Sequence, residues 1–147
     1  MPEISYSEYG ERGSIDLAPL QAATRVLLIV EVKTELVSIE STLRKLEEKV
    51  RLGPSIVRDR FGWQPALVGR VLVLPEESTA RRRVARHSAV LDQAFPQRGR
   101  AFISWLRSPF GPLAAIWFAS PTTGTYHKRR VVTRYVIRRG ETGRSGP

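Results

Sequence analysis

The chain contains no cysteine, and only two of its 147 residues are histidine. The first absence excludes disulfide bonds, thiolate zinc sites and cysteine nucleophiles. His87 and His127 stand far apart and show no recognisable ligand spacing, so we assign them no role. A metal ion in this protein would therefore be held by oxygen atoms, which favours Mg²⁺ or Mn²⁺.

Long hydrophobic runs are also missing. No apolar stretch approaches the roughly 18 residues that a membrane-spanning helix requires, and Met1-Pro2-Glu3 lacks the basic and apolar regions of a signal peptide. We therefore expect a cytoplasmic protein with no membrane partner. With 41% hydrophobic residues, a chain of this length suits one domain with one core.

Acidic residues are scarce and unevenly placed. Residues 1–50 carry nine acidic and six basic side chains, whereas residues 51–147 carry five acidic and eighteen basic ones, in a chain of net charge +10. A strongly basic body that surrounds a few acids suits a nuclease, because cations attract the polyanion while carboxylates hold a metal ion. The alternative reading of this charge is an ordinary arginine-rich surface.

The hydrophobic periodicity and the turn residues predict an α/β fold. Three strands open it, at 3–9, 14–17 and 26–32, with a turn at 10–13 and a central position for the third strand. A helix capped by Ser38 and ended by Gly53-Pro54 leads through a short helical piece at 55–61 to a parallel strand at 67–74. We further expect a helix from about 80 to 95, capped by Ser78 or Thr79, and a short helix around 102–106. Two more strands are expected at 113–119 and 128–139, followed by a disordered tail at 141–147.

The second and third strands carry the candidate site. If the hairpin folds about residues 22–25, facing residues have numbers that sum to 47, so Asp16 faces Glu31 and Ser14 faces Lys33. Side chains alternate along a strand, which places Asp16, Glu31 and Lys33 on one face. Facing Cβ atoms lie about 5 Å apart, close enough for two carboxylates to share one cation. The competing interpretation is a surface ion pair of Glu31 and Lys33, with Asp16 capping a turn.

The order βββαβ, with Asp16 on the second strand and Glu31-Val32-Lys33 on the third, resembles the PD-(D/E)XK nuclease superfamily. The stretch from Tyr9-Gly10-Glu11-Arg12-Gly13 through Glu31-Val32-Lys33-Thr34 looks like a nuclease-like domain found in actinobacterial proteins, where it often follows a helix-turn-helix domain. The resemblance covers residues 3 to about 120 and implies a restriction-endonuclease-like mixed β-sheet with flanking helices. We divide the chain into this domain, 1–120, and a basic C-terminal extension, 121–147.

The resemblance implies a metal-dependent deoxyribonuclease. Asp16, Glu31 and the backbone carbonyl of Val32 would hold Mg²⁺ or Mn²⁺, and Lys33 would assist the attacking water. Glu8 and Glu11 remain alternative third acids. With a three-residue loop in the first hairpin Glu8 would face Asp16, whereas a two-residue loop would remove that match.

The sequence as given starts with the first expected strand, without the upstream helix of many family members or a helix-turn-helix domain. We expect either a standalone or shortened version of the domain, or a fragment whose helix-turn-helix domain or partner lies outside this chain. This absence favours an alternative function, a catalytically silent module that binds DNA or acts as the effector part of a transcriptional regulator. A homodimer is one possible assembly, because dimers are common where both DNA strands must be cut.

Basic residues outside the site are candidates for phosphate contacts. Lys45, Lys49 and Arg51 lie on the first long helix, where they are predicted either to contact DNA or to form an ordinary solvated face. The run Arg81-Arg82-Arg83 favours phosphate or partner contacts over base recognition. Trp63, Trp105 and Trp117 lie in apolar surroundings and are expected in the core, with stacking of one of them on a base as the alternative.

Overall fold

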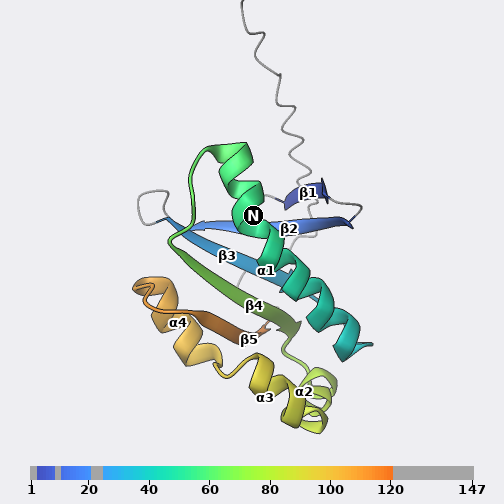
Figure 1. The fold of residues 1–147 in the computed structure, drawn as a ribbon. Coiled ribbons are helices and arrows are strands. Elements are labelled where there is room, and N and C mark those ends of the chain that lie inside the picture. Colours follow the sequence, from blue (N-terminus) through green and yellow to red (C-terminus); the bar gives the residue numbers. More distant parts are fainter. Residues whose placement is uncertain (1–2, 9–10, 21–24, 121–147) are drawn as a thin grey trace, which may run out of the picture.

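The structure is a computed structural model that describes residues 3–8, 11–20 and 25–120, with side chains from residue 25 onward (Figure 1). In chain order the elements are β1 (Glu3–Glu8), β2 (Glu11–Leu20), β3 (Val26–Val32), α1 (Ile39–Phe61), β4 (Leu67–Pro75), α2 (Ser78–Arg86), α3 (Ser88–Ala94), α4 (Gly99–Arg107) and β5 (Leu113–Ala119). The strand expected at 128–139 and the tail at 141–147 lie outside the described residues.

The five strands form one sheet in the order β1-β2-β3-β4-β5. β3, β4 and β5 run parallel, as the helical crossover after β3 predicts, whereas β1 and β2 pair antiparallel. β3 is buried at every position from Val26 to Glu31, which confirms it as a central strand. The predicted α/β class is confirmed.

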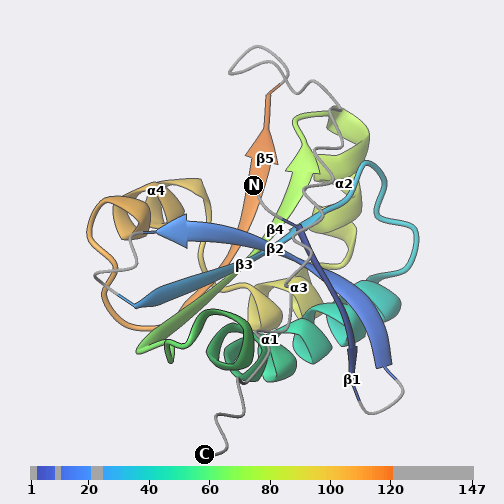
Figure 2. The ribbon, with the colours of Figure 1, turned by 90° about the horizontal axis from the view of Figure 1, so that it is seen from above.

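Helices cover both faces of the parallel part of the sheet. α1, α2 and α3 pack with Leu27 and Ile29 of β3 in one buried cluster, while α4 packs with Val26, Leu28 and Val30 in the other. Figure 2 shows α1 and α4 on opposite sides of the strands. Odd-numbered residues of β3 therefore face α1, and even-numbered residues face α4.

α1 is longer than the sequence predicts. Ser38 caps it as expected, accepting a hydrogen bond from the Ser41 backbone N–H at 3.2 Å, but the helix continues past Gly53-Pro54 to Phe61. A proline removes only one helical hydrogen bond, and Ile56 and Val57 beyond it are buried in the core. Gly53 faces the side chain of Ile29, so closely that an added Cβ would lie 3.1 Å from its Cδ1.

The single helix expected from about 80 to 95 is two helices. α2 begins at Ser78, after Glu77, which makes no side-chain capping hydrogen bond, and the chain turns at His87 before α3. Leu91 of α3 and Phe95 after it are buried in the same cluster as α1. No proline or glycine marks this turn in the sequence.

Candidate functional site

Glu31 is a buried acid in an otherwise apolar strand. It is the next-to-last residue of β3, and only 6% of its surface is exposed. In α/β sheets, ligands bind beyond the carboxyl ends of the strands. The position of Glu31 at such an end makes it the first candidate for a functional residue.

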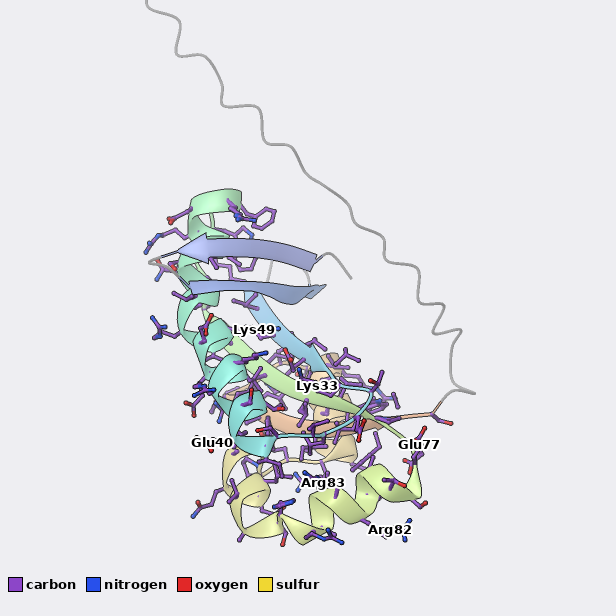
Figure 3. All side chains as sticks on the ribbon, turned by 90° about the vertical axis from the view of Figure 1, so that its right-hand side faces the viewer. Lys33, Glu40, Lys49, Glu77, Arg82 and Arg83 are labelled. Atoms are coloured by element: carbon purple, nitrogen blue, oxygen red, sulfur yellow. The ribbon has the colours of Figure 1, made fainter. Side chains whose placement is uncertain are left out.

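Two lysines neutralise this acid. Lys33 Nζ lies 3.0 Å from one carboxylate oxygen of Glu31, and Lys49 Nζ donates a hydrogen bond to the other. Lys49 comes from α1 and is buried, whereas the Lys33 side chain is 30% exposed. Figure 3 shows Lys33 and Lys49 as neighbours on the α1 side of the sheet. We call Glu31, Lys33 and Lys49 the lysine–glutamate cluster.

The electrostatics of the cluster keep Glu31 ionised. Burial by itself would raise the pKa of Glu31, but the hydrogen bonds and charges of Lys49 and Lys33 outweigh that effect and lower the pKa below its ordinary value of 4.5. The three groups together carry one positive charge. The cluster therefore offers a fixed carboxylate with an excess of ammonium groups around it.

Asp16 does not pair with Glu31. The numbers of facing residues on β2 and β3 sum to 46 instead of 47, so Asp16 is opposite Val30 and Leu17 is opposite Ile29. Paired residues of antiparallel strands belong to the same face of a sheet. The register thus pairs Asp16 with Val30 and not with Glu31, and the predicted pairing is wrong.

The first hairpin also differs from the expectation. β2 already begins at Glu11, within the turn predicted at 10–13. Glu8 pairs with Glu11, and the residue opposite Asp16 is Glu3. Neither of the two candidate third acids therefore faces Asp16. The sequence analysis missed Glu3 because the hairpin loop is shorter than the predicted turn.

The described residues do not by themselves complete a metal site. Among them, no group of three or more histidine or acidic side chains is placed to hold a metal ion. The ionised Glu31 is a suitable hard ligand, but its two oxygens already accept from ammonium groups. The carbonyl of Val32 was the third proposed metal ligand, and β3 ends at this residue. The backbone N–H of the next residue, Lys33, donates a hydrogen bond to the Val73 carbonyl at 2.9 Å.

Of the three basic residues predicted on α1, Lys45 and Arg51 are exposed, but Lys49 is buried against Glu31. A signal for this burial is present in the sequence. Lys49 lies three residues after Leu46 and seven before Ile56, on the apolar face that α1 turns toward the sheet. A single lysine on such a face predicts an acidic partner in the core, because a buried ammonium requires one.

No family model, no curated protein and no solved structure matches this chain. None of the helices that the structure describes combines the length and the hydrophobicity needed to cross a membrane. The functional assignment therefore depends on the residues of the chain itself.

Proposed function

We propose that the protein is a metal-dependent nuclease of the PD-(D/E)XK type that hydrolyses DNA phosphodiester bonds. The observation that carries this proposal is the pair Glu31 and Lys33, with a buried, ionised carboxylate and a partly exposed ammonium at the carboxyl end of a central strand. The strand order β1-β2-β3-α1-β4 and the net charge of +10 are in keeping with it.

Each member of the cluster has a distinct part in this proposal. Lys33 is exposed enough to contact a scissile phosphate and to offset the charge that develops on it. Glu31 holds the Lys33 ammonium in place, and Lys49 fixes Glu31 from the helix side. Lys49 is a positioning residue, because its buried ammonium cannot reach a macromolecular substrate.

The metal-dependent form of the proposal also requires a second acid beside Glu31. Asp16 lies on the neighbouring strand, and its pairing partner Val30 precedes Glu31. A shift of β2 by one residue would move Asp16 to the face of Glu31, since side chains alternate. We therefore include this shift as a condition of the proposal.

A cleavage assay tests the proposal. Supercoiled plasmid, single-stranded DNA and branched DNA are incubated with the chain in Mg²⁺, Mn²⁺ or EDTA, and we expect nicking in the metal buffers alone. Asp16→Asn, Glu31→Gln and Lys33→Met should each abolish it. Glu35→Gln is the matched control, because Glu35 is an exposed acid two residues beyond Lys33. Nicking by Asp16→Asn at the parental rate would contradict the assignment of that residue.

A second candidate function is a nuclease-fold module that binds DNA without cutting it. Two observations favour it, the neutralisation of both Glu31 oxygens by lysines and the register that separates Asp16 from Glu31. The same assay distinguishes the two functions. Salt-sensitive binding with no product in any metal buffer would identify the module, whereas metal-dependent product identifies the enzyme.

A further inference from the structure

A long groove follows the outer edge of β5. It has a volume of about 1210 Å³ and runs between α2 and α3 on one side and α4 on the other. Figure 2 shows β5 between α4 and α2. Among the described residues, Gln97 pairs with the strand edge at the floor, through a short parallel bridge to Ala115.

The walls of this groove are basic. Arg81, Arg98, Arg100 and Arg107 line it, and Asp92 is the single acidic lining residue in the part of the chain that the structure describes. Arg81 is held by Glu76, and Arg98 is held by Asp92. Arg100 and Arg107 are exposed and have no acidic partner among the described residues. They stand seven residues apart on α4, and therefore on one side of that helix.

The N-terminus of α4 opens into the same groove. Arg98, Gly99, Arg100 and Ala101 all line it, and Arg98, the capping residue, makes no side-chain capping hydrogen bond. The first hydrogen bond of the helix runs from the Phe102 N–H to the Arg98 carbonyl at 3.1 Å. The preceding backbone N–H groups and the helix dipole favour an anion at this end.

The β5 strand at the floor of the groove presents one aromatic side chain on each face of the sheet. Trp117 lies on the α4 face and Phe118 on the α2 face, and each is half-buried. The Arg81 guanidinium lies 4.3 Å from the ring centroid of Phe118, whereas Trp117 meets Phe102 edge-on at 5.3 Å. An aromatic floor between arginine walls is the combination that binds unpaired bases together with their phosphates.

We propose that this groove binds a segment of single-stranded nucleic acid, with phosphates at Arg100, Arg107 and the start of α4, and a base stacked on Trp117. The inference rests on the proposed function for its substrate class, but it does not require cleavage. Glu31, Leu72 and Ile116 lie in one row across the sheet, so the backbone of β5 at the floor is two strands, or about 10 Å, from the backbone of Glu31.

The first experiment tests how much the two free arginines contribute to the affinity. Fluorescence anisotropy measures the binding of a fluorescein-labelled 20-mer of deoxythymidine in EDTA over a range of salt concentrations. We expect Arg100→Gln combined with Arg107→Gln to weaken binding about 10-fold or more and to lower the slope of log K against log salt by about 1.4. Arg44→Gln combined with Arg86→Gln is the matched control. It removes the same charge from exposed positions of α1 and α2 that do not line the groove. An equal loss in both variants would overturn the groove as the binding site.

Trp117→Leu tests the stacking contribution. It should weaken binding of the 20-mer by about 5- to 100-fold without changing the salt slope, because stacking involves no counter-ion release. Circular dichroism and thermal melting verify that the variant is folded. Unchanged affinity in folded Trp117→Leu would overturn the proposed stacking, and equal competition by polyglutamate of the same charge would overturn the nucleic acid as ligand. If the parent binds the 20-mer but does not cleave DNA in Mg²⁺, the proposed nuclease activity is wrong and the proposed binding groove still stands.

Discussion

Glu31 is an acid in the core whose charge is balanced from two elements. Glu31 and Lys33 were identifiable from the sequence, because a charged residue at the end of an apolar run is unusual. The partnership with Lys49 was not, because it depends on how α1 lies across β3. Breaking a buried ion pair by removing one partner costs about 3–5 kcal/mol, since the remaining charge stays buried.

The lowered pKa of Glu31 predicts how stability depends on pH. An acid whose pKa is lower in the folded state stabilises the fold above its unfolded pKa, here about 4.5, and loses that contribution as the pH falls through the folded pKa. Urea unfolding of the parent and of Glu31→Gln, followed by tryptophan fluorescence, should therefore differ most at pH 7, and the difference should shrink as the pH falls below 4.5 and through the folded pKa. A difference that grows on acidification would contradict the ion pairing. Glu35→Gln, at an exposed position, should show little difference at any pH.

The two lysines should differ in their contribution to stability. Lys49→Met should lower the free energy of unfolding by about 3–5 kcal/mol, because Lys49 and Glu31 are both buried. Lys33→Met should cost less than about 1.5 kcal/mol, because the Lys33 ammonium is partly hydrated. Chemical denaturation at pH 7 provides both values, and a larger loss for Lys33→Met would reverse our ranking of the two partners.

At the scale of elements, the sequence predicted the positions of strands better than their register. β3 is apolar on both faces, so Leu17 can face either Ile29 or Val30 without exposing a hydrophobic residue there. A one-residue change of register moves every side chain of β2 to the other face. The extension of α1 beyond Pro54 was missed for a related reason, because it depends on tertiary contacts of Ile56 and Val57.

The absence of native cysteines allows a direct test of the β2 register. Asp16→Cys combined with Val30→Cys should form a disulfide on mild oxidation, because paired strand positions have suitable Cα separations. Asp16→Cys combined with Glu31→Cys should form far less, since its two positions belong to opposite faces. Non-reducing electrophoresis after protease digestion measures both. Preferential crosslinking of the second pair would show that β2 adopts the register of the metal site.

The contact between α4 and the sheet depends on Gly69 of β4. A Cβ added there would lie 2.9 Å from a ring carbon of Trp105 and 3.2 Å from Cβ of Leu113. Gly69→Ala should therefore lower the free energy of unfolding by about 1–3 kcal/mol through overpacking. Gly62→Ala is a useful comparison, because Gly62 has a φ of 72° and no neighbour within 4 Å. Its cost of about 1 kcal/mol comes from backbone strain alone.

At the scale of the whole molecule, more than half of the net charge comes from residues outside the proposed folded domain. Residues 121–147 carry seven basic side chains and one acidic one, so a chain that ends at Ser120 has a net charge of +4 instead of +10. We expect this truncation to weaken DNA binding and to reduce its salt dependence. The melting temperature should change little if residues 1–120 form the folded domain. Scanning calorimetry and anisotropy measure the two effects, and loss of the cooperative transition would contradict that division.

The balanced charges at Glu31 have a consequence for the folded state as a whole. Lys33 and Lys49 belong to the same chain as Glu31, so the buried carboxylate needs no counter-ion from the solution. Dialysis against a chelator should therefore leave the protein as heat-resistant as before. The integrity of the fold is then independent of whichever cation the solvent supplies.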